Sequence, residues 1–350
     1  MYKTVSERFS RKVTFVSFIL SIFVMYIHAN KLVFSDAGAQ FAPVMVLNKL
    51  SAETFGRIGV PFFFLQSGYW MFQFDIFEPK SQVLKRKLKK KVFTLGIPFL
   101  LWNTLGLLFF LVVTRLPVLS SMIHEGRVVP FTLRNVLGGI FLHQYNLVFW
   151  FMQDLNVLAA LSPVWLRLLR NRLLTDIAIG GLLVLVMLGI NSPIFQSSSL
   201  LLFLAGGALS TYHRAYWETI SADSRFIGFH LILFLILAAV KWLEIPYLST
   251  LAVIISPILF WKCCDWLGKT GIYDREPCWF CRQSFFIYAA HDFPVEAMST
   301  LLLKVSHHWA WLAIGYAATP LIVLAGIYVC ARLLSQKLPK VYRLLCGSRG

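Results

Sequence analysis

Long apolar runs recur along the whole chain and limit what it can fold into. Ten windows approach the roughly 20 residues that a helix needs to cross about 30 Å of hydrocarbon. Inside lipid, every backbone amide must be paired within its own segment, so these windows are predicted to be helices rather than open strands. The windows are 13–30, 54–74, 92–114, 145–165, 173–190, 195–212, 226–243, 247–265, 280–303 and 309–334. The sequence therefore predicts an all-α, polytopic integral membrane helix bundle with about ten transmembrane helices.

Composition and the placement of charge agree with this fold class. Of the residues, 58% are hydrophobic and 14% are charged, whereas a soluble domain carries about a quarter charged residues. The net charge of +17 would suggest a nucleic-acid partner in a soluble protein. If the N-terminus is cytoplasmic, however, all but eight of the 33 lysines and arginines fall on the cytoplasmic side, as the positive-inside rule requires. We therefore expect both termini in the cytoplasm, membrane lipid as a partner and no nucleic acid.

No stretch of the chain resembles a separate soluble domain. We expect a single integral membrane domain over residues 1–350, with residues 336–350 as a short basic cytoplasmic tail. The first apolar run has no small-residue cleavage site and is predicted to be an uncleaved helix rather than a signal peptide. Five of the six cysteines lie at the predicted inner face. Because that side of the membrane is reducing, disulfides are not expected.

A few polar residues lie inside these apolar windows. A charged group at bilayer depth costs about 3 kcal/mol or more, so such residues usually face the bundle interior and serve a function. His28 lies near the end of the first window, and Asp154 follows Trp150 by one turn in the fourth. Glu53 and Arg57 stand four residues apart at the start of the second window, in the order that favours an ion pair on one helical face. That pair could equally do no more than stabilise its helix.

The ninth window holds the densest polar pattern. Ser284, Tyr288 and His291 follow one another at helical spacing and share one face, while Asp292 occupies a neighbouring face. Pro294 cannot donate to the carbonyl four residues before it, so a kink is expected beside His291. A histidine here could take a proton from a hydroxyl group and return it, because the pKa of its imidazole lies near neutrality. A lone buried histidine, however, is more often a hydrogen-bonded packing residue.

Four stretches of the sequence are similar to motifs of a known family. They are the apolar run that closes on His28, the segment Arg57-Ile-Gly-Val-Pro-Phe-Phe-Phe-Leu-Gln-Ser-Gly-Tyr69, the basic residues 84–89 followed by Gly96-Ile-Pro-Phe-Leu-Leu-Trp102, and the pair formed by Leu147-Val-Phe-Trp-Phe151 with Ser284-Phe-Phe-Ile-Tyr-Ala-Ala-His291. This ordered set resembles the bacterial acyltransferase family 3, membrane O-acyltransferases that modify cell-envelope glycans. The resemblance implies a multi-pass protein of the bacterial inner membrane.

The resemblance also implies the substrates. The donor would be a cytoplasmic acyl-CoA, with acetyl as the commonest acyl group, and no cofactor would remain bound. The acceptor would be a hydroxyl group of a glycan or lipid-linked sugar. The phosphates of the donor would be attracted by the basic loop 80–91, which could also serve only to fix the orientation of the neighbouring helices. The donor-binding residues expected there are Lys85, Arg86, Lys87, Lys89 and Lys90.

Site roles follow from the same resemblance. His28 would act as general base, Arg57 would stabilise the thioester oxyanion or a substrate anion, and His291 would orient the acceptor together with Asp154. We count His28, His291 and Arg57 as candidate catalytic residues. The candidate substrate-binding residues are Glu53, Asp154, Trp150, Ser284 and Tyr288. No metal site is expected.

One position departs from the family pattern. The family usually has an arginine eleven residues before the helix-1 histidine, and this chain has Ser17 there. If that arginine helps to bind the acyl donor, the protein either uses another cation or has lost acylation.

Two alternatives to the acyltransferase remain open. A glycan transporter or export component without acyl transfer is the main one. A zinc or redox site at Cys278-x-x-Cys281 is a second, although the neighbouring pair Cys263-Cys264 suits a tetrahedral site poorly. No Gly-x-Ser-x-Gly nucleophile motif occurs, and Gly68 is interpreted as a helix-packing residue.

Overall fold

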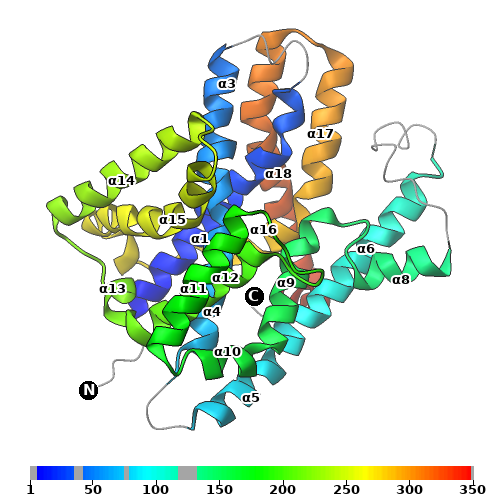
Figure 1. The fold of residues 1–350 in the computed structure, drawn as a ribbon. Coiled ribbons are helices and arrows are strands. Elements are labelled where there is room, and N and C mark those ends of the chain that lie inside the picture. The colour runs from blue at the N-terminus through cyan, green and yellow to red at the C-terminus, as the bar shows by residue number, and fades with distance from the viewer. Residues whose placement is uncertain (1–5, 35–41, 75–78, 117–131, 348–350) are drawn as a thin grey trace. The chain divides into compact units, whose positions relative to one another are not determined.

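The computed structural model describes residues 6–34, 42–74, 79–116 and 132–347, and these residues form helices and no strand (Figure 1). The all-α fold class is confirmed. Residues 348–350 of the expected tail lie outside the described residues. The helices are α1 (Glu7–His28), η1 (Asn30–Leu32), α3 (Ala42–Asn48), η2 (Lys49–Gly56), α4 (Arg57–Phe72), α5 (Lys80–Lys91), η3 (Val92–Gly96), α6 (Ile97–Val113), α8 (Leu133–Phe141), η5 (Leu147–Phe149), α9 (Trp150–Ala160), α10 (Ser162–Leu168), α11 (Arg172–Met187), α12 (Ser197–Tyr212), α13 (Arg214–Glu218), α14 (Ser224–Trp242), α15 (Leu248–Cys263), η6 (Cys264–Thr270), η7 (Ile272–Asp274), η8 (Phe280–Gln283), α16 (Ser284–Ala290), α17 (Asp292–Val305), α18 (Trp309–Lys337) and α19 (Pro339–Leu345).

Five helices among the described residues are long and apolar enough to cross a membrane. They cover Glu7–Leu32, Lys80–Val113, Ser224–Trp242, Leu248–Thr270 and Trp309–Lys337, and a pair bent by 63°, Leu147–Ala160 with Ser162–Leu168, would make a sixth. The remaining windows fall on α4, α11 and α12, with 16 residues each, and on the α16–α17 pair, which breaks at His291. At 1.5 Å per residue, the 16 residues of α11 or of α12 reach only about 24 Å, whereas α4 continues η2 without a break. These helices fit a multi-pass membrane protein; the number of about ten spans and the cytoplasmic place of both termini stay predictions.

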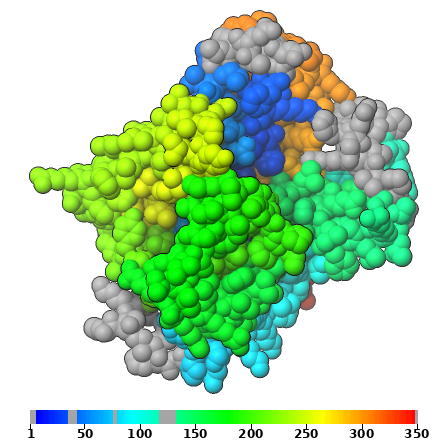
Figure 2. Space-filling model, viewed as in Figure 1, coloured from blue at the N-terminus to red at the C-terminus, as the bar shows by residue number. Residues whose placement is uncertain are grey.

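The candidate spans have apolar outer faces. In α14, Phe229, Ile232, Leu235 and Ile236 are each more than half exposed. Figure 2 shows α14, in yellow-green, with its side chains at the surface. Contiguous apolar surface of this kind is unusual on a soluble monomer. Lipid chains would cover it.

Residues 80–91, which the sequence predicted to be a loop, form the helix α5. The stretch contains neither glycine nor proline, and lysine and arginine favour helix. Val83 and Leu84 are buried. On the same side of the helix, Lys87 donates to the carbonyl oxygen of Trp70, in the last turn of α4, at 2.7 Å. α5 therefore has one side that holds α4 and one exposed basic side, made of Lys85, Arg86, Lys89 and Lys90.

Contacts divide the chain into two compact units. In the first unit, α4 packs on α12 and α15, α11 packs on α12, and α14 packs on α15. In the second unit, α18 packs on α16, α17 and α19, and α6 packs on α8 and α19. The first unit consists of Met1–Ile19, Arg57–Lys91 and Asp154–Arg282, and the second of Leu20–Gly56, Val92–Gln153 and Gln283–Gly350.

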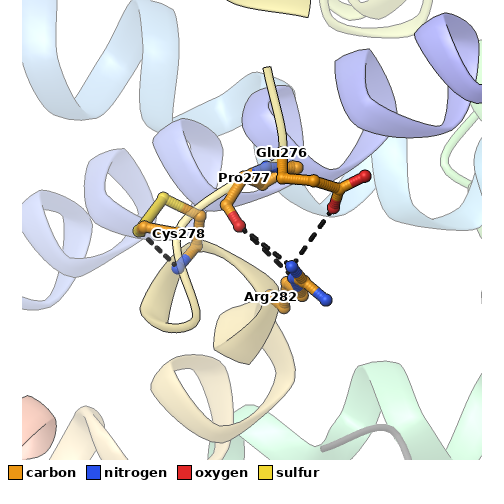
Figure 3. The surroundings of a disulfide bond; sticks show 5 residues. Glu276, Pro277, Cys278 and Arg282 are labelled. Carbon is orange, nitrogen blue, oxygen red and sulfur yellow. Dashed lines mark hydrogen bonds and ion pairs between the residues drawn. A yellow bond between two sulfur atoms is a disulfide. The ribbon is translucent and has the colours of Figure 1, made fainter.

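The expectation that the cysteines carry no disulfide is wrong for one pair. Cys278 and Cys281 form a disulfide, with their Cα atoms 5.3 Å apart (Figure 3), a separation that disulfides require. The two cysteines are only three positions apart in the sequence. The chain between them folds back, and the N–H of Cys281 donates to the sulfur of Cys278. Beside this turn, Arg282 pairs with Glu276 at 3.2 Å. Among the described residues, no group of three His, Cys, Asp or Glu side chains could hold a metal ion.

Two glycines bring the main chains of α4 and α12 into contact. A Cβ atom added at Gly68 would overlap the carbonyl oxygen of Phe203, and one added at Gly206 would overlap the carbonyl oxygen of Leu65. Small residues that permit such approach are typical of membrane helix pairs. The interpretation of Gly68 as a packing residue is therefore confirmed.

We predict that Gly68→Ala destabilises the protein by about 2 kcal/mol or more, because the two helices must move apart to admit the methyl group. The matched control is Gly180→Ala in α11, where an added Cβ would meet nothing within 4 Å. The control is expected to be neutral or to stabilise by up to about 1 kcal/mol through helix propensity. Thermal unfolding of the purified protein in detergent measures both, and equal unfolding temperatures would contradict the packing role.

Candidate functional site

A histidine and an aspartate meet in the second unit. α1 ends at His28 and α17 begins at Asp292, and Nδ1 of His28 lies 2.9 Å from Oδ1 of Asp292. Because an ionised carboxylate can only accept, Nδ1 carries a proton, and in the neutral imidazole Nε2 is the acceptor. The His28 side chain is 27% exposed and that of Asp292 only 6%. This is the arrangement of an imidazole base held in one tautomer by a buried carboxylate.

The position of Asp292 depends on a break in the helix. The kink expected from Pro294 is confirmed, since α16 ends at Ala290 and α17 starts two residues later. A carboxylate in the first turn of a helix is also favoured by the helix dipole. Sequence reasoning set Asp292 on a neighbouring face and gave it no role. The proline two residues after it was the signal that could have identified it.

His291 packs beside His28. The two ring centroids lie 4.7 Å apart and the ring planes are at 77°. The side chain of His291 is buried, and its Nδ1 lies 2.6 Å from the carbonyl oxygen of Tyr288. A carbonyl oxygen only accepts, so this Nδ1 carries the proton. Within the described part of the chain, Nε2 of His291 makes no hydrogen bond.

Tyr288 links this histidine pair to the segment before α9. Its hydroxyl group donates to the carbonyl oxygen of Val148, and its ring lies 5.7 Å from that of Phe149. The structure thus gathers three predicted site residues, His28, His291 and Tyr288, around Asp292.

Three other predicted site residues belong to the second unit. Trp150 begins α9, Ser284 begins α16, and Glu53 lies in η2, a π-helical segment. All three are half-buried, and their substrate contacts stay predictions. Arg57 is exposed, begins α4 and belongs to the first unit. Its ion pair with Glu53 stays a prediction as well.

Asp154 is buried in the first unit and holds the start of α12. Its Oδ2 accepts hydrogen bonds from the hydroxyl group of Ser199 at 2.6 Å and from the N–H of Gln196 at 3.0 Å. Such bonds satisfy donors that the first turn of a helix leaves open. This capping role was not predicted, and the role of Asp154 in substrate binding stays a prediction.

Three described cations that precede Ser17 (Arg8, Arg11 and Lys12) are engaged in holding α1. The ammonium group of Lys12 is fully buried, 2.5 Å from Oδ1 of Asp265 and 2.6 Å from the carbonyl oxygen of Trp261. Oδ2 of Asp265 accepts from the N–H of Ser221 at 3.1 Å and lies 3.8 Å from the ammonium group of Lys262. Lys12 is therefore part of a buried ion pair and does not replace the missing arginine.

Two further pairs fasten the same end of α1. Arg8 pairs with Asp274, and Arg11 pairs with Glu276, each at 2.8 Å. Next to Asp274, the hydroxyl group of Tyr273 donates to the carbonyl oxygen of Cys264 at 2.8 Å. Burial raises the pKa of Tyr273 well above its usual range, so the phenol keeps the proton that it donates.

The apolar helices of spanning length fit a membrane protein, and its second unit contains a half-buried imidazole that is hydrogen-bonded to a buried carboxylate. Comparison with known families specifies it further. The profile of the acyltransferase 3 family, described as an acyltransferase domain, matches residues 15–331, and the chain belongs to this family. Family membership implies acyltransferase activity. Neither the curated proteins nor the solved structures gave a match.

We predict that Asp265→Ala costs more stability than Lys12→Met. Asp265→Ala leaves the buried ammonium groups of Lys12 and Lys262 without their carboxylate. Lys12→Met leaves the carboxylate of Asp265, which still contacts Lys262 and Ser221. Removal of one partner of a buried ion pair typically costs about 3–5 kcal/mol, and we expect Asp265→Ala in that range and Lys12→Met below it. Thermal unfolding in detergent measures the difference, and the opposite order would show that Lys12, rather than Asp265, is the centre of this cluster.

Proposed function

We propose that the protein is an O-acetyltransferase of the bacterial inner membrane, which moves an acetyl group from cytoplasmic acetyl-CoA to a hydroxyl group of a glycan or lipid-linked sugar. The observation that carries this proposal is the hydrogen bond between His28 and Asp292 in a chain of an acyltransferase family. Donor and acceptor follow from the resemblance of the sequence motifs. Family membership favours acyl transfer over the export alternative.

The proposed step is a direct transfer. Nε2 of His28 takes the proton from the acceptor hydroxyl as its oxygen attacks the thioester carbonyl carbon. The tetrahedral intermediate collapses, the carbon–sulfur bond breaks, and the leaving CoA thiolate takes the proton back from the imidazolium. The products are the acetyl ester and CoA. Asp292 stabilises the imidazolium that forms in between, as the carboxylate does in a Ser-His-Asp triad.

Roles for the remaining predicted residues complete the proposal. Arg57 would stabilise the oxyanion or a substrate anion, and His291 and Asp154 would orient the acceptor. Substrate contacts are assigned to Glu53, Trp150, Ser284 and Tyr288. No resident cofactor takes part in these steps.

The exposed side of α5 is proposed to attract the donor. Lys85, Arg86, Lys89 and Lys90 present their charges on one face, where they would draw in the phosphates of acetyl-CoA by long-range attraction. Lys87 belongs to the same predicted set. Because its ammonium group is bonded to carbonyl oxygens at the end of α4, its contribution would be to hold the helix in place.

We predict that His28→Ala lowers kcat by about 10²–10⁴-fold, the usual contribution of general base catalysis, while binding of acetyl-CoA persists. Asp292→Asn is expected to lower kcat to a similar extent, because an amide can fix the wrong imidazole tautomer. The measurement is release of CoA from acetyl-CoA in native membrane vesicles that contain the variant. The matched control is the exposed His307→Ala, and near wild-type activity of folded His28→Ala would remove His28 from the mechanism.

We predict that the double variant Lys85→Glu/Lys89→Glu raises KM for acetyl-CoA by about tenfold at low ionic strength. The effect should shrink as salt is added, because screening weakens attraction between exposed charges. Lys340→Glu/Arg343→Glu makes the same change of net charge at exposed residues of the tail and should leave KM unchanged. Equal effects of the two double variants would argue against a donor site on α5.

A further inference from the structure

Two buried asparagines of the second unit carry an amide oxygen without a hydrogen-bond donor. Asn103 lies in α6 and is 0% exposed, and Asn146 lies just before η5 and is 2% exposed. In the described part of the chain, Oδ1 of each residue makes no hydrogen bond. Nε2 of His291, in the same unit, is a third such acceptor.

The two amides lie on one side of α6. Asn103 and Gly106 are three residues apart and therefore share a face of the helix. A Cβ atom on Gly106 would lie 3.4 Å from Cβ of Asn146 and 3.8 Å from the ring of Phe293. The glycine thus allows Asn146 to approach the helix. Asn146 and the ring of Phe293 therefore both approach α6 at Gly106, one helical turn from Asn103.

The same contacts connect the amides to the histidine pair. Phe293 directly follows Asp292, the partner of His28. Asn146 precedes by two residues Val148, whose carbonyl oxygen accepts from Tyr288. Asn146 is thus connected, through its neighbours in the chain and in space, to the segments that hold Asp292 and Tyr288.

The orientation of one amide is set by its other atom. Nδ2 of Asn103 donates to the carbonyl oxygen of Ile140 at 3.4 Å, which leaves Oδ1 on the opposite side. A buried polar atom without a partner destabilises a protein, and polar side chains inside membrane helices usually mark substrate or ion paths. All three open atoms are acceptors, so they call for a ligand that donates.

We propose that Asn103 and Asn146 form a substrate subsite that accepts hydrogen bonds from N–H or O–H groups of a reactant. This inference rests on the proposed function. In that reaction, two reactants supply such donors: acetyl-CoA, above all through the amide N–H and hydroxyl groups of its pantetheine arm, and the acceptor, through the hydroxyl groups that do not react. Phosphates and the thioester carbonyl supply none, so they bind elsewhere.

The test uses Asn103→Leu and Asn146→Leu in the full-length protein, each of similar size but without an acceptor. Asn103→Ala and Asn146→Ala serve wherever a leucine variant fails to fold. The matched control is Thr319→Val, which removes a fully buried hydroxyl group that makes no hydrogen bond among the described residues of the same unit. Unfolding temperature is measured in detergent. Release of free thiol is measured in native membrane vesicles with acetyl-CoA and with S-acetylpantetheine, which keeps the arm and lacks the nucleotide.

If the amides bind the donor, each variant should raise KM for both thioesters by about three- to tenfold, the loss of one hydrogen bond. If they bind the acceptor, KM for both thioesters should stay unchanged while the rate at saturating thioester falls by a similar factor. In either case the unfolding temperature of Asn146→Leu should stay level or rise, as for Thr319→Val, because a buried unpaired acceptor is removed. Asn103→Leu also loses the hydrogen bond to Ile140, so a moderate fall in its unfolding temperature is expected together with the kinetic change.

Kinetic constants within twofold of wild type for both folded variants would overturn the subsite, since the amides would then bind nothing but water. A fall in unfolding temperature with unchanged kinetics would overturn it too, by showing a purely structural role. Failure of the proposed function looks different, because wild-type protein would then release no thiol, or His28→Ala would release as much as wild type.

Discussion

Carboxylates hold α1 in both units. In the first unit Asp265 receives the buried ammonium group of Lys12, and in the second unit Asp292 receives the imidazole of His28. In a low-dielectric interior a charge without a partner is costly, so Lys12 can be buried only where an aspartate lies beside it. The two aspartates, in η6 and at the start of α17, lie more than 240 residues away in sequence. The chemistry proposed for the site rests on the second contact, between His28 and Asp292.

The polar groups of the protein fall into two kinds. Asp154, Lys87 and Lys12 are bonded to main-chain or charged partners and are explained by the architecture. Nε2 of His291 and the amide oxygens of Asn103 and Asn146 make no hydrogen bond among the residues that the structure describes. A fold tolerates open acceptors where a second molecule completes them. Other buried polar atoms, such as the side-chain amide of Gln66 and the hydroxyl groups of Ser210 and Thr319, are open in the described residues as well. An open acceptor therefore points to a ligand only where its neighbours also lead to the proposed site, as they do for Asn146.

Sequence patterns predicted what depends on short separations. The helical class follows from apolar runs, the break at His291 from Pro294, and the tight packing at Gly68 from residue size. Contacts between residues more than 40 positions apart in the sequence were not predicted. Asp292 could not be joined to His28, because a helical wheel drawn through the break sets it on another face. The contact of Asp154 with the start of α12 was missed because the two lie far apart in the sequence. Residues 80–91 were predicted to be a loop because of their high charge, although they contain neither glycine nor proline. The disulfide between Cys278 and Cys281 was not expected because their predicted side of the membrane is reducing, although their spacing permits the bond.

The contact between α4 and α12 has a consequence for how the sequence can vary. What blocks a side chain at Gly68 or Gly206 is a carbonyl oxygen of the facing main chain, which every amino acid possesses. No smaller side chain at Phe203 or Leu65 can therefore make room, and a second substitution there cannot rescue the first. In a screen for suppressors, these two glycines should revert rather than be compensated. Elsewhere in the bundle, where side chains meet side chains, paired changes of volume remain open to selection.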